Sequence, residues 1–567
     1  MLLDQTHQVM DIANSSQIEI TSIKQVQSQI ERTMTWTNWS GNLQYKPTAE
    51  DGQYYFLPTN ESELKSIINQ AMQSQSTIKL RVSGQRHSAT PLIVNSNENN
   101  PQINTQHGSQ WTVDLACYND LGEQGNNDIV IDKANLTVTV NAGVTEDQLD
   151  AYLTANNLML KTVTAGGFFS VGGMAAVDVH GATVDNSILA DTIIAYTVMN
   201  DKGQKKTYDM NSRLFKGFKP LQFHRVSLGT LGIITSVTFK VQPRPYKNTL
   251  VPSQSYYSIN DKDAFINTYE NLLFSKRYQS VESFYNPYAT YYNVLALRWS
   301  IDSNPNTPIL NNPVPEKVET ACEIAQKRQW GAPLLNPVAE TLVQNTGQSI
   351  QNNGTELSGN TSISGAMAEI YDQMNTAIEA NKAMWLTQST RAAFMSYFIP
   401  LPKNRYHGLD VAWDALQIIT NRLKEHHDFT MIIPPEFRFV RGSDALLAGV
   451  YSDDPDQLFI SIEVLAMTKK TDTTNYPQNI LNFFANIEYQ WVKLGGIPHQ
   501  GKLYGFFDPS TFDPQKDIKG VAPFNPNYIQ TLNQRRGERL KVFAEYKKML
   551  DPKGVFSNAY TDSITSG

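Results

Sequence analysis

The spacing of apolar residues predicts alternating helices and strands between about residues 45 and 245. Asn60 is a good N-cap three residues before Glu63, so we expect a helix to follow it. The apolar positions on one face of this helix are Leu64, Ile67, Ile68 and Ala71. The strand-like segment 77–82 comes next and ends in a polar loop that contains glycine.

Two more strands frame the rest of this region. Residues 136–140 alternate between apolar and polar, and Thr145 with Gln148 forms a capping box for the helix that follows. The last strand of the region is predicted at 231–239, with Pro243 just beyond it.

Between about residues 246 and 510 the composition of the chain differs from that of the preceding region. Aromatic residues gather at 284–292, and a polar stretch at 343–364, rich in Asn, Gln, Ser and Gly, predicts a loop or insertion. Strands are expected at 431–440 and 457–464, and helices at 410–425, 476–493 and 530–550. A chain of 567 residues organised in this way requires about two to four domains.

Composition narrows the classes of function. Charged residues make up 18% of the chain, its net charge is −7, and no long run of Lys or Arg occurs. We therefore expect no nucleic-acid partner, because phosphate contacts need clustered cations. No stretch approaches the roughly 20 apolar residues of a membrane span. No signal peptide is visible, so we expect a cytoplasmic protein unless a signal was removed, and a secreted or periplasmic one in that case.

The two cysteines, Cys117 and Cys322, lie far apart in sequence. They form neither a metal-binding nor a redox motif, and they pair only if the fold brings them together. We expect no metal site.

Two glycine-containing segments carry the first candidate chemistry. Residues 81–88 place Gly84 after a predicted strand, where the backbone can turn tightly and offer amide N–H groups to a phosphate. Residues 164–174 contain two Gly-Gly pairs, against which a flat or phosphorylated ligand can lie, and His180 follows closely. The second segment does not have the nicotinamide-binding pattern Gly-x-Gly-x-x-Gly. Alone, the first segment would be an ordinary surface loop and the second a pair of turns.

A third segment, 434–439, places Glu436 and Arg438 two residues apart and therefore on one face of a strand. Buried together, these side chains can form a hydrogen-bonded ion pair. At an exposed strand edge the same pair would contribute little.

In this order, the segments resemble the FAD domain of the vanillyl-alcohol oxidase family, and the likeness covers almost the whole chain. Residues 137–153 are similar to the family element tVtVxaGvtxxqLxxxL, 228–235 to its closing strand GxLGIIT, and 551–558 to its C-terminal DPxGxFxN. The resemblance implies an α+β fold with a two-part FAD-binding domain and an α+β substrate-binding domain, whose antiparallel sheet is flanked by helices. The implied boundaries are an N-terminal extension 1–45, the FAD-binding domain 46–245, the substrate-binding domain 246–510, and a segment 511–567 that returns to the FAD-binding domain.

The resemblance also implies how the cofactor is held. A histidine at the position of His87 carries an 8α-histidyl bond to FAD in this family. We expect this bond alone, since no cysteine lies near the second glycine-rich segment. Sugar and alditol oxidases typically have glycine where this chain has Arg86. The implied FAD-binding residues are Val82, Ser83, Gly84, Gln85, Arg86, His87, Ser88, Gly166, Gly167, Ser170, Val171, Gly172, Gly173, His180, Gly232 and Ile234.

The implied catalytic residues come from three further segments. Glu436 and Arg438 resemble the Glu-x-Arg pair of class II cholesterol oxidases, and 498–502 resembles the PHxGK of aldonolactone oxidases, which implies that Lys502 lies near the flavin. Glu282 lies in a segment similar to a strand that lines the substrate cavity. Either Glu436 or Glu282 would take the hydroxyl proton, and Arg438 with Lys502 would stabilise the developing negative charge.

Chain length and the aromatic cluster at 284–292 favour a class II cholesterol oxidase. Such an enzyme would use FAD and molecular oxygen to oxidise and isomerise a 3β-hydroxysterol, giving a ketone and hydrogen peroxide. A sterol substrate would also imply transient contact with a membrane surface. The alternatives are a sugar, alditol or aldonolactone oxidase of the same fold, a flavin dehydrogenase with poor oxygen reactivity, a non-catalytic flavin-binding scaffold, and a carbohydrate-binding protein without flavin.

Overall fold

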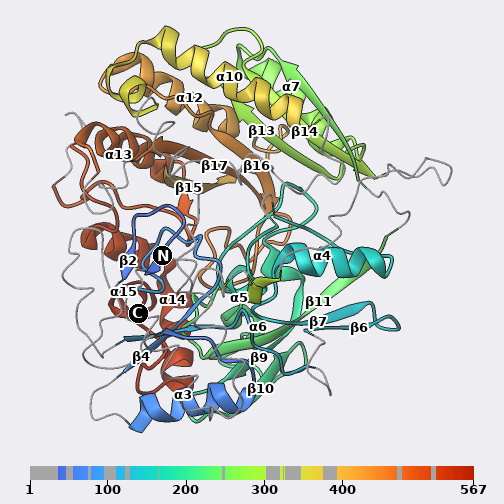
Figure 1. The fold of residues 1–567 in the computed structure, drawn as a ribbon. Helices are drawn as coiled ribbons and strands as arrows, with labels where there is room; N and C mark the ends of the chain where they lie inside the picture. Colours follow the sequence, from blue (N-terminus) through green and yellow to red (C-terminus); the bar gives the residue numbers. More distant parts are fainter. Residues whose placement is uncertain are drawn as a thin grey trace, which may run out of the picture.

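The structure is a computed structural model, in which three sheets form two layers of the molecule (Figure 1). It describes residues 36–45, 55–73, 78–94, 110–121, 128–164, 167–244, 250–301, 320–323, 325, 347–374, 392–468, 476–511 and 519–566. The mixed α+β class with an antiparallel sheet flanked by helices, predicted from the sequence, is confirmed.

A six-stranded antiparallel sheet lies at the centre of the lower half of Figure 1. Its strands are β6 (Ile129–Asp132), β7 (Thr137–Asn141), β8 (Leu158–Leu160), β9 (Ile193–Met199), β10 (Lys205–Asp209) and β11 (Ile233–Pro243). They run in the order β10-β9-β11-β7-β6, and β8 pairs with the C-terminal end of β11. Between them come α4 (Glu146–Ala155), α5 (Val171–Ala176), η2 (Leu189–Thr192) and α6 (Pro220–His224).

A small parallel sheet packs beside it. Its order is β3 (Tyr55–Phe56), β5 (Gln110–Asp114) and β4 (Lys79–Ser83). Helix α3 (Glu61–Gln73) buries the four apolar residues that its sequence periodicity predicts, and Asn60 accepts a hydrogen bond from the backbone N–H of Glu63 at 3.0 Å. Both sheets share one hydrophobic core. A short hairpin of β1 (Trp36–Thr37) and β2 (Gln44–Tyr45) precedes them.

The upper half of Figure 1 is a seven-stranded antiparallel sheet. Its order is β12 (Leu250–Tyr257), β14 (Val294–Ile301), β13 (Ser280–Tyr285), β16 (Glu436–Arg441), β17 (Leu458–Met467), β15 (Ala392–Leu401) and β18 (Ile497–Pro498). Four helices cover its outer side: α7 (Lys262–Phe274), α10 (Glu356–Met374), α12 (Leu409–Glu425) and α13 (Gln478–Lys493). The other side faces the two smaller sheets, so a ligand between the halves contacts both.

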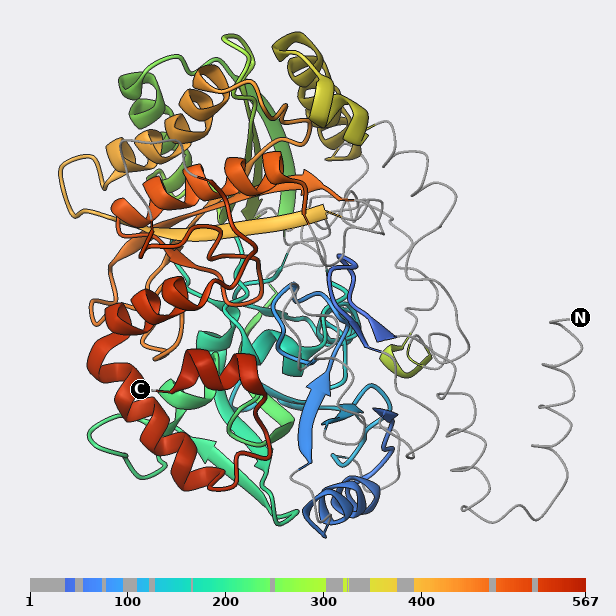
Figure 2. The same cartoon turned by 90° about the vertical axis from the view of Figure 1, so that its left-hand side faces the viewer.

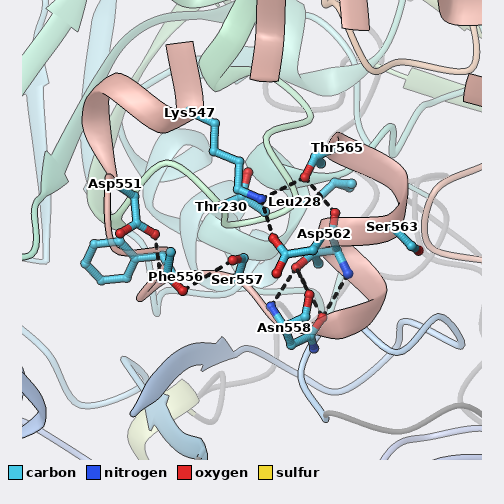
Figure 3. A network of polar contacts seen from close by, with 12 residues as sticks. Leu228, Thr230, Lys547, Asp551, Phe556, Ser557, Asn558, Asp562, Ser563 and Thr565 are labelled. Atoms are coloured by element: carbon cyan, nitrogen blue, oxygen red, sulfur yellow. Dashed lines mark hydrogen bonds and ion pairs between the residues drawn. The ribbon is translucent and has the colours of Figure 1, made fainter. Parts of the chain in front are cut away.

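Helices α14 (Pro526–Leu550) and α15 (Ala559–Thr565) return to the lower half, where Figure 2 shows them in red beside the green strands. Tyr546 of α14 stacks on Phe223 of α6 with 4.1 Å between ring centroids. Lys547 donates to Asp562 at 2.6 Å and to Thr565 at 2.9 Å, which fixes α15 against α14 (Figure 3).

Arg81 of β4 links this C-terminal region to the glycine-rich loops. Its side chain is 2% exposed and donates to the carbonyl oxygens of Leu92, Leu228 and Phe556. Burial of a guanidinium is tolerated here because carbonyl acceptors surround it.

Cys117 and Cys322 form a disulfide that spans 205 residues of sequence. Next to it, the backbone N–H of Ala321 donates to the side chain of Gln148, the capping-box residue of α4, at 2.9 Å. The segment around Cys322 is therefore fastened to the lower half by one covalent bond and one hydrogen bond.

Most element predictions are confirmed, with two differences. The polar stretch predicted as a loop at 343–364 is largely helical within its described part, because α10 buries Ile363, Met367 and Ile370 at helical spacing. The strand predicted at 431–440 begins only at Glu436, because Pro434 and Pro435 have no N–H group to donate to a neighbouring strand. Thr77, at the start of another predicted strand, and most of the extension 1–45 lie outside the described residues. Within the described ranges, no helix combines the length and the apolar character needed to cross a bilayer.

Candidate active site

A large cavity lies between the two halves of the molecule, and the predicted segments meet around it. One wall comes from the loops that follow β4 and β5 and from residues around α5 and β11. The opposite wall comes from β15, β16 and β17 and from the loop after β18.

The loop after β4 contributes Gly84 to Ser88 to the cavity wall. Arg86 has a positive φ of 66°, the left-handed backbone conformation that glycine adopts without strain. Its guanidinium lies over the rings of Trp36 and Tyr55 and donates to the Tyr55 hydroxyl at 3.1 Å. Arg86 therefore gives the loop the turn that a glycine would give, and contacts between its side chain and two aromatic rings offset the strain.

His87 lies among aromatic rings at the cavity wall. Trp39 stacks on it at 5.5 Å between centroids, and Phe168 and Phe169 lie at 4.6 and 5.0 Å. Phe168 and Phe169 belong to the second glycine-rich segment, so the two segments that looked weak separately converge on this histidine.

The glycines allow these segments to approach closely. A Cβ added to Gly84 would lie 2.1 Å from the hydroxyl oxygen of Ser170, and one added to Gly172 would lie 2.7 Å from the Cβ of Ala142. Any side chain at these positions would push the loops apart, so the cavity wall here consists largely of backbone.

The opposite wall follows the alternation of strand β16. Phe437 packs against Tyr269 of α7 on the outer side of the sheet, so Glu436 and Arg438 face the cavity. In the sheet, Glu436 pairs with Glu463 of β17, and Arg438 lies between Glu282 of β13 and Ser461 of β17.

The strand pairing, together with the loop after β18, brings three carboxylates and two cations close to one another; they are Glu282, Glu436, Glu463, Arg438 and Lys502. Arg438 Nη2 lies 3.2 Å from Glu282 Oε1 and also forms an ion pair with Glu436. Lys502 Nζ lies 2.8 Å from Glu463 Oε2 and 4.5 Å from the centre of the Phe394 ring. Each cation therefore has at least one carboxylate partner at the cavity.

Burial, together with the charges of Glu282 and Glu463, raises the pKa of Glu436 to about 8 against the opposing effect of Arg438 and Lys502. The same carboxylates raise the pKa of Arg438. Arg438 is therefore charged at every relevant pH, whereas Glu436 exchanges a proton near neutrality.

Two histidines lie beside this cluster and are neutral. Burial and the charge of Arg438 hold the pKa of His180 well below its ordinary value, and burial with the charge of Lys502 lowers that of His499 to about 3. The Nδ1 atom of His180 lies 2.8 Å from the carbonyl oxygen of Gly181, and its Nε2 lies 3.1 Å from the Ser461 hydroxyl. These contacts favour the tautomer in which Nδ1 donates and Nε2 accepts.

Asp178 anchors the loop that carries Lys502. Its carboxylate is fully buried and accepts from the backbone N–H groups of Gln500 at 2.8 Å and Gly449 at 2.9 Å. The loop from the upper half is thereby attached to the lower half, and the position of Lys502 depends on that junction.

The structure brings most of the predicted site residues to this one cavity. Those that line it are Val82, Ser83, Gly84, Gln85, Arg86, His87, Ser88, Ser170, Gly172, Gly173, His180, Gly232, Ile234, Glu436, Arg438 and Lys502. Val171 and Gly167 lie just behind the wall, and Gly166 lies outside the described residues. Glu282 does not line the cavity either: it contacts Arg438 from the neighbouring strand.

Several lining residues were not predicted. Among them are Trp39, Phe168, Phe169, Phe394, Ser396, Ser461, Glu463 and His499. The alternation of β17 could have indicated that Ser461 and Glu463 share a face, but only the strand pairing shows that this face is the one of Glu436.

The aromatic residues at 284–292, which favour a sterol substrate in the sequence, are not among the residues that line this cavity. Phe284 and Tyr285 are buried in the core of the upper half, whereas Tyr291 and Tyr292 are 74% and 70% exposed. In the register of β13 and β16, Phe284 pairs with Glu436 and shares its face of the sheet, whereas Tyr285 packs against α12, where its hydroxyl lies 2.7 Å from that of Thr420.

The residues present fit FAD. The glycine-rich wall offers backbone N–H groups to a pyrophosphate, and the aromatic rings around His87 offer flat surfaces. On the other wall, the Nε atom of Arg438 is buried and has no hydrogen-bond partner among the described residues, as expected of a group that meets a ligand.

Comparison with known families defines the class of the protein. Residues 52–208 match the family model described as FAD binding domain, and residues 326–564 match the one described as D-arabinono-1,4-lactone oxidase. The chain is an FAD-linked flavoprotein oxidase, an oxidoreductase that acts on a CH–OH group with oxygen as acceptor.

Individual relatives refine this class. The D-arabinono-1,4-lactone oxidase of Candida albicans is 22% identical over 595 residues, which cover 93% of this chain and 95% of that protein. The L-gulonolactone oxidase of Mus musculus is 22% identical over 536 residues, which cover 93% and 97%.

Solved structures share the fold. A solvent-stable cholesterol oxidase aligns with a TM-score of 0.61 at 16% identity, covering 94% of this chain and 97% of that one. The cholesterol oxidase from B. sterolicum gives 0.61 at 17% identity, covering 94% and 96%. At these identities the likeness shows the fold alone, and the sequence relatives favour the aldonolactone alternative over the sterol hypothesis.

Proposed function

We propose that this protein oxidises an aldonolactone, or a closely related polyhydroxylated sugar derivative, with FAD and molecular oxygen. The observation that carries the proposal is the polar character of the cavity wall opposite the glycine-rich loops. Of the lining residues contributed by the upper half and the loop after β18, only Phe394 and Gly501 lack a polar side chain. The others are Ser396, Glu436, Arg438, Ser461, Glu463, His499 and Lys502.

A sterol would need a different wall. Its fused rings would have to be desolvated by a long apolar surface with few polar groups at one end. Here a sterol would leave several buried donors and acceptors without partners, at a cost of about 1–3 kcal/mol each. A polyhydroxylated lactone supplies hydroxyl and carbonyl groups for them, and the names of the sequence relatives agree with this choice.

The chemistry is divided between cofactor and protein. When bound, FAD would supply a hydride acceptor for the carbinol carbon, and molecular oxygen would take up the two electrons as hydrogen peroxide. Glu436 takes the hydroxyl proton, because it lines the cavity and burial raises its pKa to about 8, close to neutrality. Arg438 and Lys502 stabilise negative charge that develops on the substrate oxygen.

Glu282 has a supporting role in this scheme. It pairs with Arg438 across β13 and β16, lies 3.2 Å from the guanidinium, and is not among the residues that line the cavity. We therefore assign proton transfer to Glu436 and orientation of Arg438 to Glu282.

We also propose that FAD is bound covalently through His87. The position of His87 on the cavity wall, enclosed by Trp39, Phe168 and Phe169, supports this attachment. The disulfide between Cys117 and Cys322 supports a further proposal, that the protein matures in an oxidising compartment, because such bonds rarely persist in the cytosol. Free thiols at both cysteines in protein isolated from its natural source would refute that location.

A substrate panel tests the proposed reaction. Peroxide formation is measured with an aldonolactone, xylitol and cholesterol at equal flavin concentrations. We expect kcat/KM to be highest for the lactone and turnover of cholesterol to be absent. Preferential oxidation of cholesterol would refute the proposal, and flavin reduction without peroxide would indicate a dehydrogenase.

A further inference from the structure

Glu463 belongs to none of the sequence motifs, yet it lies at the centre of the charged cluster. It is on β17, directly opposite Glu436 on β16, and it lines the same cavity. Residues paired in this way have Cβ atoms about 4.5–5.5 Å apart. Two carboxylates so close would repel each other if both were ionised and unaccompanied.

Lys502 is the cation that accompanies Glu463. Its Nζ lies 2.8 Å from Glu463 Oε2, and the side chains are 27% and 17% exposed. The Lys502 side chain extends from a glycine-containing loop, which by itself leaves a long flexible side chain with many accessible conformations. The contact with Glu463 and the position over the Phe394 ring at 4.5 Å select one of them.

We infer that Glu463 is a positioning residue of the active site, which holds the Lys502 ammonium at the cavity wall and faces Glu436 across the strand pair. This inference rests on the proposed function for its catalytic meaning. It predicts two separable effects, one on substrate binding through Lys502 and one on proton transfer through Glu436.

The second effect follows from the groups that face Glu436. They are Arg438 on its own strand, Glu282 on β13, Glu463 on β17, and Lys502 on the loop after β18. The two neighbouring glutamates raise the pKa of Glu436, and the two cations lower it. Removing the charge of Glu463 takes away one of the two repelling carboxylates and frees Lys502 to approach Glu436, so both changes favour the ionised form of Glu436.

The test compares Glu463→Gln with the parent protein by the pH dependence of kcat. We expect the inflection attributed to Glu436 to move down by about one pH unit, the usual size of such an effect between neighbouring charges. We also expect KM to rise several-fold as Lys502 loses its partner. Glu538→Gln is the matched control, because Glu538 is 79% exposed on α14, remote from the cavity lining. It should reproduce the parent profile.

Glu463→Asp separates charge from length. It keeps the carboxylate opposite Glu436 but shortens the reach to Lys502, so the inflection should move down less than in Glu463→Gln while KM still rises. If Glu463→Asp moves the inflection as far as Glu463→Gln, the charge is not the cause and the inference is overturned. An unchanged inflection in Glu463→Gln overturns it as well.

A measurement without turnover distinguishes this inference from the proposed function. Because Glu436 has a raised pKa when folded, this group binds more protons in the folded protein than in the unfolded chain between about pH 4.5 and 8, and its contribution to stability falls as pH rises through that window. In Glu463→Gln this fall should be smaller and end at lower pH, as followed by thermal unfolding of the flavin-loaded protein. If the proposed function is wrong, the parent protein will not oxidise the lactone, and this result does not depend on the unfolding curves.

Discussion

Replacement of Arg438 by Met tests the electrostatic core of the proposed site. The guanidinium lies 3.2 Å from Glu282, forms an ion pair with Glu436 and keeps its Nε free of partners among the described residues. Methionine replaces the aliphatic part of the arginine side chain and has no charge, so the substitution keeps most of the apolar packing and removes the guanidinium. We expect kcat/KM to fall by about 10²–10³, or about 3–4 kcal/mol of lost transition-state stabilisation.

The structure also gives the effect on the carboxylates. At 3.2 Å and an effective dielectric constant of about 20, the attraction between Arg438 and Glu282 is about 5 kcal/mol. Without it, Glu282 and Glu436 would be buried near each other with no adjacent guanidinium. Because Arg438 lowers the pKa of Glu436, its loss should raise that pKa further above the ordinary value, so the ionised base would form only at higher pH.

The assay follows peroxide formation at several substrate concentrations, with flavin content measured by absorbance in each preparation. Arg441→Met is the control, because Arg441 lies on the same strand, bonds to Asp456 at 2.5 Å and does not line the cavity. A kcat/KM for Arg438→Met within a few-fold of the parent, with flavin content unchanged, would refute the role assigned to Arg438.

Three other predictions address the cofactor, the base and the disulfide. In His87→Ala we expect no flavin fluorescence in the protein band after denaturing electrophoresis; a fluorescent band would exclude His87 as the attachment point. Because Glu436 must be ionised to accept a proton and has a pKa of about 8, kcat should rise with pH and level off above about 8, and a flat profile from pH 6 to 9 would exclude it as the base. Reduction of the disulfide at Cys117 should lower the free energy of unfolding by up to about 5 kcal/mol, since it closes a loop of about 205 residues. A Cys117→Ser/Cys322→Ser variant should have the same denaturation midpoint with and without reductant, and a reductant-dependent midpoint in that variant would contradict this explanation.

Local patterns were sufficient for much of the fold. The capping box of Thr145 and Gln148 is present as predicted, since such signals involve only neighbouring residues. The helical part of the polar stretch 343–364 does not show in its composition, because Asn, Gln, Ser and Gly are abundant there and the buried residues Met367 and Ile370 lie beyond its end.

The site required information that a single segment does not contain. The sequence places Glu436 and Arg438 on one face, but which glutamate reaches the cavity depends on how β13, β16 and β17 pair. Sheet order ranks Glu436 ahead of Glu282 and brings in Glu463, whereas the sequence left the two predicted glutamates equivalent and did not single out Glu463.

The C-terminal region that bonds to Arg81 has a consequence for biosynthesis. The carbonyl oxygen of Phe556 accepts from a residue 475 positions earlier, and Leu80 of the same strand donates to Val555 at 2.7 Å. During translation, β4 and the loop that carries His87 leave the ribosome long before these partners exist. We therefore expect stable flavin loading to be a late, post-translational event, and a truncation before residue 551 to release a protein that is synthesised normally but stays colourless.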